Sequence, residues 1–453
     1  MSSSAHVFGR RTELEAPPII EPQGDLGRVQ RDSNTSHLRA LCLTKIDAAS
    51  LAHLPSARIE AMVEQILTEL ATEHRIQLNA REQRQLAIEL VDDMIGLGPL
   101  ESLLADDSIT DIMVNGHDRI FIERGGRLEQ VDIRFRDNVH ATNIAQRIAS
   151  TVGRRVDEAS PMVDARLKDG SRVNIVLPPL AIDGPCLSIR KFAKKSIDFK
   201  KLVQFGTMTT PISRLLEIAA RCRLNVIISG GTGSGKTTLM NAMSRFIETS
   251  ERIVTVEDAA ELQLQQPHVV RLETRPQNLE GRGEVNQRDL VRNALRMRPD
   301  RIIIGEVRGT EAFDMLQAMN TGHDGSMSTI HANNTRDALA RIENMVQMAS
   351  MGLTLRAIRQ QVVSAVDLFV QVERQRDGVR RLVQVTEVAG IEGETVLLND
   401  IVKLEILGED SSGKLTSRYD ISVGRPCFQE QLTYFGLLRS WNAAIEEAQG
   451  GSS

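Results

Sequence analysis

The stretch that decides the fold reads Gly230-Gly231-Thr232-Gly233-Ser234-Gly235-Lys236-Thr237-Thr238. It follows an apolar run from Leu224 to Ile228 and leads into the apolar-rich residues 239–243. A β-branched strand, a glycine loop and a helix in this order form the setting in which Gly, any four residues, Gly-Lys-Thr cradles nucleotide phosphates. The sequence therefore predicts a phosphate loop between a strand and a helix.

Each residue type in this loop meets a physical need. Glycines allow positive φ, so that backbone N–H groups can turn inward around phosphate oxygens at the positive end of the following helix. Lys236 can reach the β and γ phosphates, and the Thr237 hydroxyl can ligate the Mg²⁺ that bridges them. Mg-ATP is therefore the expected ligand. The residues expected to bind it here are Gly230, Gly231, Thr232, Gly233, Ser234, Gly235, Lys236, Thr237 and Thr238.

Bulk composition bounds the class of protein. A length of 453 residues suggests two to four domains. Lys plus Arg number 55 and Asp plus Glu 60, a net charge of −5, which gives no overall basic field for nucleic acid. Only 3% of residues are aromatic, which disfavours single-strand binding by base stacking. We therefore expect no nucleic-acid partner.

The chain is expected to be cytoplasmic. Its four cysteines are far apart and form no Cys-x-x-Cys pair, which indicates a reducing compartment rather than a disulfide framework. No apolar run approaches the roughly 20 residues that span a bilayer, and no apolar signal segment opens the chain. We expect no intrinsic membrane span, and attachment to a membrane only through a partner.

The first hundred residues divide into a tail and a helical bundle. Residues 1–36 mix Ser, Pro, Gly and charges without a period, which predicts a disordered tail. Residues 37–96 are helical in pattern, and Asn79 with Glu82 three residues later forms a capping box before a helix that stops at Gly96. One apolar stripe precedes it, formed by Ile59, Met62, Val63, Ile66, Leu67 and Leu70.

The period changes to two over residues 97–192. Hairpin signals at Asn115-Gly116 and Gly125-Gly126 separate short apolar strands, and one amphipathic helix carries Ile144 and Ile148. This pattern predicts a small mixed α/β domain. Residues 193–207 begin with a charged run without a clear period, which predicts a linker and a candidate hinge.

Three further polar residues follow apolar strands after the phosphate loop. Glu257 ends the run from Ile253, Glu306 follows the run from Arg301, and His331 follows residues 327–330. Parallel strands bring their carboxyl ends to one edge of a sheet, so these side chains can converge with Lys236. One carboxylate is needed to hold Mg²⁺ and another to activate the attacking water. The sequence therefore predicts a phosphohydrolase site.

Four ordered motifs carry a family resemblance. They are GGTGSGKTT (230–238), VTVEDAAEL (254–262), RPDRIIIGEVRG (298–309) and GHDGSMSTIHANN (322–334). They resemble the boxes of the secretion-superfamily ATPases, which drive type II and type IV secretion and type IV pilus assembly. Between them, LETRPQNLEGRGEV (272–285) and LRMRPD (295–300) resemble the CpaF/TadA branch, the ATPases of Tad or type IVc pili.

The resemblance implies an architecture and roles for site residues. It implies a RecA-like P-loop ATPase domain over 208–405, a PAS-like α/β domain over 97–192 and the helical bundle before it; residues 406–453 match less well, and their role stays open. By position it implies phosphate contacts from residues 233–237. The roles implied for the other positions are a water-activating Glu257, a Mg-associated Glu306 that shares the metal with Thr237, a phosphate-sensing His331, and nucleotide-binding arginines at Arg166, Arg172 and Arg190. The two glutamate roles could be exchanged.

The resemblance also implies a homo-hexamer that works on an inner-membrane platform protein of a pilus or secretion system. The expected activity is therefore ATP hydrolysis coupled to assembly or retraction of a filament, or to protein translocation. Two alternatives stay open: a nucleic-acid translocase on the same core, and a nucleotide-regulated scaffold. The scaffold is disfavoured because nothing in it requires a water-activating carboxylate.

Overall fold

The computed structural model describes residues 26–46, 55–192, 197–275, 277, 282–349, 352–411, 413–422 and 424–450. The chain divides into two compact units, Met1–Lys191 and Phe192–Ser453, and each is described by itself. No helix among the described residues is long and apolar enough to cross a membrane.

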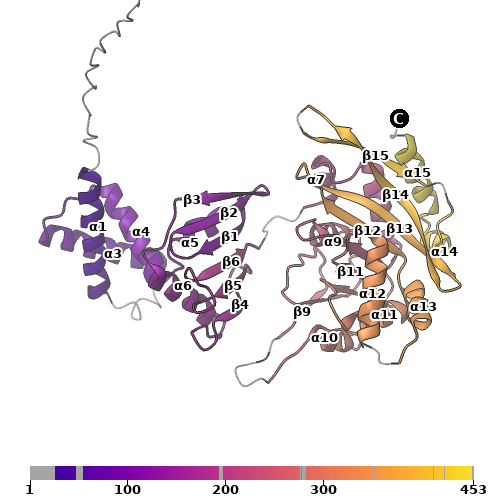
Figure 1. Cartoon of the computed structure of the whole chain (residues 1–453), viewed down its shortest axis with the longest axis horizontal. Helices are drawn as coiled ribbons and strands as arrows, with labels where there is room; N and C mark the ends of the chain where they lie inside the picture. Colours follow the sequence, from indigo (N-terminus) through magenta and orange to yellow (C-terminus); the bar gives the residue numbers. More distant parts are fainter. Residues whose placement is uncertain are drawn as a thin grey trace, which may run out of the picture. The chain divides into compact units, whose positions relative to one another are not determined.

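Three helices open the first unit and pack on one another (Figure 1). They are α1 (Leu26–Lys45), α3 (Ser56–Glu73) and α4 (Ala80–Met94). The predicted capping box is confirmed, because the Asn79 side chain accepts from the backbone of Glu82 and the Glu82 side chain accepts from the backbone of Asn79. The apolar stripe of α3 is buried at Ile59, Val63, Leu67 and Leu70, whereas Met62 is 39% exposed.

Helix α1 corrects the prediction for the N-terminal tail. It begins at Leu26, inside the stretch 1–36 that the composition predicted to be disordered, while residues 1–25 lie outside the described residues. The C-terminal half of α1 packs into the core through Leu38 and Cys42, with Leu41 and Leu43 partly buried against it. The sequence of the first half shows no apolar period, so its helix was not predicted.

The rest of the first unit is a mixed α/β domain, as predicted. Its helices are α5 (Leu100–Ala105) and α6 (Asn138–Thr151). Its strands are β1 (Ile109–Asn115), β2 (Arg119–Arg124), β3 (Arg127–Val131), β4 (Met162–Arg166), β5 (Arg172–Val176) and β6 (Cys186–Arg190). They form an antiparallel sheet in the order β3-β2-β1-β6-β5-β4. Ile144 and Ile148 of α6 are fully buried in its core.

The second unit is built on a nine-stranded sheet in the order β15-β14-β13-β12-β7-β11-β10-β8-β9. The parallel strands are β7 (Val226–Ser229), β8 (Ile253–Glu257), β9 (Val269–Glu273), β10 (Arg301–Ile304), β11 (Met327–Ile330) and β12 (Leu368–Arg374). The antiparallel extension consists of β13 (Arg380–Glu392), β14 (Thr395–Glu409) and β15 (Leu415–Ile421). The predicted parallel core is thus present.

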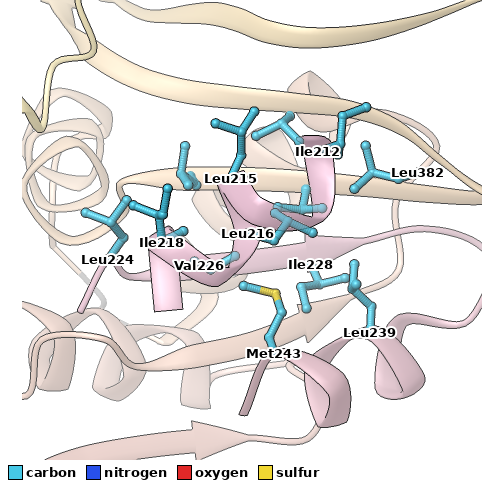
Figure 2. Packing of buried hydrophobic residues seen from close by; sticks show 14 of the residues in the cluster. Ile212, Leu215, Leu216, Ile218, Leu224, Val226, Ile228, Leu239, Met243 and Leu382 are labelled. Carbon is cyan, nitrogen blue, oxygen red and sulfur yellow. The ribbon is translucent and has the colours of Figure 1, made fainter. Parts of the chain in front are cut away.

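Helices cover both faces of this sheet. One face packs against α8 (Thr210–Arg221), α9 (Lys236–Ser244), α14 (Gln429–Tyr434) and α15 (Leu438–Gly450), and Figure 2 shows Leu215, Leu216 and Met243 beside Val226 and Ile228. The other face, to which Ile227 points, packs against α10 (Gln287–Ala294), α11 (Glu311–Asn320), α12 (Thr335–Ala349) and α13 (Leu355–Ala365). All four residues of β7 are buried, and Val226 and Ile228 join one core while Ile227 joins the other. The strand before the phosphate loop is therefore fixed between two cores.

Two predicted boundaries differ from the structure. Helix α7 (Phe199–Gln204) lies inside the expected linker 193–207, and its Phe199 and Leu202 are buried in the core of the second unit. Strand β14 crosses the expected boundary at residue 405, and β15 and α15 continue the same sheet and core. Residues 406–450, where described, are therefore part of the ATPase fold because Ile421, Leu432 and Trp441 are buried in it.

Candidate active site

The phosphate loop joins β7 to α9 with the backbone that its glycines predicted. Gly230, Gly233 and Gly235 have φ of 155°, 68° and 97°, a region that glycine enters without steric cost. A Cβ on Gly230 would lie 2.2 Å from the carbonyl oxygen of Val372 on β12. These three positions therefore favour glycine because of their backbone conformation, and Gly230 does so because of close packing as well.

Lys236 opens α9 and folds back over this loop. Its Nζ donates to the carbonyl oxygens of Gly230 and Gly231 at 3.0 and 2.9 Å. Burial lowers the pKa of Lys236, and the nearby Glu306 opposes that shift. The ammonium is thus already held over the loop, where phosphate oxygens would give it stronger, charge-assisted partners than neutral carbonyls.

Glu306 and His331 meet beside this lysine. Strands β10 and β11 are neighbours, and the residues that follow them place His331 Nε2 2.8 Å from Glu306 Oε1. The same Nε2 atom lies 3.5 Å from Lys236 Nζ. Burial, with the charge of Lys236 next, lowers the pKa of His331. This shift favours the neutral imidazole.

Glu306 has further partners that sequence reasoning missed. Arg308 donates to its Oε2 at 2.6 Å, and Gln287 donates to its backbone oxygen at 3.0 Å. Arg308 also lies 3.8 Å from Asp258, which follows β8. Arg308 stands inside the motif 298–309, and its position two residues after Glu306 is the signal that could have marked it. Arg308 thus holds one carboxylate oxygen of Glu306, while the other lies 2.8 Å from His331 Nε2 without a hydrogen bond.

Glu257 occupies a different environment on the adjoining strand. Val256 of β8 pairs with Ile304 of β10, and the Glu257 side chain at the end of β8 is only 3% exposed. Its Oε2 accepts from the backbone N–H of Glu261 and Leu262 at 2.7 and 2.9 Å, while Oε1 is buried without a partner. Burial raises the pKa of Glu257 to about 7. A carboxylate in this state suits proton transfer at neutral pH.

Gly305 explains how Glu257 is accommodated. A Cβ at Gly305 would lie 2.8 Å from Cγ of Glu257, closer than real Cβ contacts. The glycine between β10 and Glu306 therefore leaves the space in which the Glu257 side chain sits. Sequence reasoning quoted this glycine in the motif but gave it no role.

The remaining loop residues fit a Mg-nucleotide. The Ser234 hydroxyl is buried and has no partner, and Thr237 lies in the first turn of α9. Within the described part of the chain, no group of three His, Cys, Asp or Glu side chains could hold a metal alone. The oxygen donors present, Thr237 and Glu306, suit Mg²⁺, which binds through one or two protein groups together with substrate phosphates and water. Bound Mg²⁺ would supply charge stabilisation to the phosphates.

The three candidate arginines lie together in the first unit. Arg166 of β4 pairs in register with Arg172 of β5, which pairs in turn with Arg190 of β6. Like charges directly opposite one another destabilise a sheet. Arg172 also lies 3.4 Å from Asp164, and Arg190 lies 3.2 Å from Asp111. The structure thus brings the three candidate arginines side by side on neighbouring strands.

The family model described as Type II/IV secretion system protein matches residues 93–396. The chain belongs to this family. It is an ATPase. A putative conjugal transfer protein of Mycobacterium tuberculosis is 42% identical over 310 residues, which are 67% of this chain and 88% of that protein.

Two other similar proteins are a conjugal transfer protein and an ATPase of a type IV secretion system. The conjugal transfer protein TrbB of Rhizobium radiobacter is 36% identical over 294 residues, which are 64% of this chain and 86% of that protein. The crystal structure of the VirB11 ATPase from the Brucella suis type IV secretion system, in complex with sulphate, is 29% identical, with a TM-score of 0.35. The match covers 64% of this chain and 95% of that structure.

Proposed function

We propose that this ATPase uses Mg-ATP to power assembly of a Tad or related type IV pilus or secretion system, as a hexameric ring on an inner-membrane platform protein. The single observation that carries the proposal is the contact series from Lys236 through His331 to Glu306, beside the buried Glu257. It joins the phosphate loop to Glu306, next to Glu257, whose pKa burial raises to about 7. A carboxylate that can accept a proton at neutral pH supports hydrolysis rather than passive nucleotide binding.

In the proposed mechanism, Lys236 and the loop N–H groups bind the β and γ phosphates of ATP. Glu257 accepts a proton from the attacking water, because its Oε1 lacks a partner and its pKa of about 7 makes it an effective base. Glu306, which accepts from Arg308 and lies beside His331, would hold Mg²⁺ together with Thr237, and the ion would supply charge stabilisation to the phosphates. His331 then senses the γ-phosphate through its closeness to Lys236.

Hydrolysis becomes motion if the α/β domain of the first unit closes on bound ATP. Arg166, Arg172 and Arg190 present the guanidinium groups for this closure, since they gather on one edge of its sheet. Guanidinium groups gain charge-assisted, often bidentate bonds to a phosphate. Loss of the γ-phosphate would release the domain. The expected hinge falls largely on residues 193–196, which lie outside the described residues.

The Tad branch is the finer part of this proposal. It is supported by the motifs 272–285 and 295–300, and by the helices α1, α3 and α4, most of which precede the family match that begins at residue 93. The similar proteins named for conjugal transfer favour a conjugation or type IV secretion system instead. Purification of the chain from membranes distinguishes the two, according to which polytopic protein is recovered with it.

A nucleic-acid translocase is the second candidate, and the names of the conjugal transfer proteins are the observation in its favour. The net charge of −5 and the low aromatic content oppose it. Addition of single- and double-stranded DNA to the purified chain tests the choice. We expect the rate of phosphate release from ATP to stay unchanged with DNA and to rise with the platform protein; the reverse pattern would overturn the proposal.

A further inference from the structure

The hairpin of β12 and β13 packs against the phosphate loop and supports its conformation. The side chain of Gln371 on β12 accepts from the Ser229 hydroxyl at 2.5 Å, just before the loop begins. The carbonyl of Val372 fills the space that a side chain at Gly230 would need. The middle of the loop has its own support from the other strand, at Arg380.

Arg380 is the first residue of β13, and its Nε and Cδ atoms lie against the loop. Its Nε donates to the carbonyl oxygen of Gly233 at 2.8 Å. Its Cδ is the atom nearest to where a Cβ at Gly235 would stand, at 3.4 Å. In a trans peptide the carbonyl and the following N–H point in opposite directions. By holding the oxygen of Gly233, Arg380 therefore turns the N–H of Ser234 away from β13.

That N–H group is available to a ligand at little cost. Ser234 N donates to the oxygen of Gly231 at 3.4 Å, a long bond that a phosphate oxygen can replace. The Ser234 hydroxyl beside it is buried without a partner. The orientation that Arg380 imposes is thus one that leaves two donors of the same residue for an anion.

The strand that carries Arg380 is itself fixed by the two residues that follow it. Its neighbour Arg381 is buried and bonds Asp377 through both terminal nitrogens, at 2.8 and 2.7 Å. Leu382 N donates to the oxygen of Thr207 at 2.8 Å, which ties β13 to the turn after α7. A hydrogen bond from a side chain on so rigid a support can hold a mobile glycine loop in one conformation.

We infer that Arg380 is a positioning residue of the phosphate loop, which pre-orients the Ser234 N–H for the nucleotide by holding the carbonyl of Gly233. The inference rests on nucleotide binding at this loop. Such a residue acts equally on bound ATP and on the transition state, so that its loss weakens binding more than chemistry. The role concerns one hydrogen bond from Nε, rather than the positive charge near the phosphates.

The test measures KM and kcat for ATP hydrolysis by the full chain, and the Kd of a fluorescent ATP analogue. Arg380→Ala should raise KM and Kd about tenfold, the loss expected for one charge-assisted hydrogen bond, with kcat within about twofold of the wild type. Arg380→Lys keeps the charge without an Nε–H and should remain impaired. The matched control is Arg376→Ala, in the same hairpin, whose side chain pairs with Glu409.

Each alternative outcome overturns the inference. Unchanged KM and Kd in Arg380→Ala would show that the bond to Gly233 does not contribute to nucleotide binding. Wild-type KM and Kd in Arg380→Lys would show that the charge alone matters. A kcat defect without a KM defect would make Arg380 a transition-state residue instead. Lys236→Ala separates this question from the proposed function, since a hydrolysing Lys236→Ala protein would refute the site itself. The Arg380 side chain is exposed, so an unchanged thermal midpoint without nucleotide should confirm that each variant folds.

Discussion

His331 Nε2 lies 2.8 Å from Oε1 of Glu306, so that the residues after two adjacent strands place an imidazole against a carboxylate. Arg308 donates to the other oxygen of Glu306. Glu257 differs, because it is only 3% exposed, accepts from two backbone N–H groups and has its pKa raised by burial to about 7. The two carboxylates, whose roles are interchangeable by sequence, are therefore distinguished by their surroundings, which favour Glu257 as the base.

The pH dependence of turnover follows from this difference. Burial raises the pKa of Glu257 to about 7, so that the carboxyl is protonated below that pH and cannot accept a proton from water. We expect kcat to rise with pH through about 7 and to level off above it. Steady-state phosphate release at saturating Mg-ATP, measured from roughly pH 5.5 to 9, checks this prediction. A rate that is flat or falls over this range would contradict it.

Conversion of each glutamate to glutamine tests the assignment of roles. Glu257→Gln keeps the shape but not the basicity, and should lower kcat by about 10² to 10⁴ while ATP still binds. A folded-state pKa raised above its unfolded value makes stability fall as pH rises above about 4.5, so this variant should be no less stable than the wild type at pH 8. Glu306→Gln should also lower kcat, and should weaken the dependence on Mg²⁺.

If only Glu306→Gln retains tight ATP binding with loss of turnover, the two roles are reversed. Titration with Mg²⁺ and binding of an ATP analogue, measured on both variants, separate the cases. The thermal midpoint of each variant serves as the control for folding.

The space beside Gly305 gives a prediction that needs no change in charge. Gly305→Ala would place a methyl group 2.8 Å from Cγ of Glu257, and should displace that side chain at a cost of about 1–3 kcal/mol in stability. We expect kcat to fall with little change in ATP binding. Gly231→Ala is the comparison, because a Cβ there would meet open space and its φ is not positive. Gly322 also has open space, but its positive φ would strain an alanine. Normal kcat in Gly305→Ala would show that the position of Glu257 is unimportant.

The arginine edge of the first unit should act on turnover more than on product binding. Arg172→Ala and Arg190→Ala should each slow ATP hydrolysis by less than the ~10³ to 10⁵ assigned to a single arginine finger, because the residues share the charge. ADP affinity should change little. Arg119→Ala is the matched control, since Arg119 lies on the same sheet and pairs with Asp183.

Mixing experiments then tell which chain the arginines serve. If they serve the nucleotide of their own chain, mixtures of Lys236→Ala and Arg190→Ala proteins should recover no activity. Recovery would mean that the arginine crosses to a neighbouring subunit. An unchanged rate in the double variant Arg172→Ala/Arg190→Ala would refute closure by these residues.

Local signals predicted the elements that local chemistry determines. The capping box at Asn79 and the glycine conformations at Gly230, Gly233 and Gly235 are properties of neighbouring residues, and both are present. The order of strand-end residues in a parallel sheet was also sufficient to place Glu306 and His331 near Lys236.

Partners set by tertiary packing were not visible in the same way. Arg308 stands in a motif and Arg380 in none, but for both only the fold shows the partner, Glu306 for one and Gly233 for the other. Strand β15 and helix α15 carry no motif, yet they complete the sheet and its core. The helical period of Leu438, Trp441, Ile445 and Ala448 marks an apolar face of α15, but a period does not reveal what that face packs against.

The most direct test of the central claim is the ATPase activity of Lys236→Ala. Removal of the ammonium that lies over Gly230 and Gly231 takes away the mobile cation for the β and γ phosphates. The measurement is phosphate release from Mg-ATP by the wild type and the variant at equal concentration. The account predicts that turnover is abolished and nucleotide binding weakened, with the thermal midpoint unchanged; near-normal hydrolysis by Lys236→Ala would contradict it.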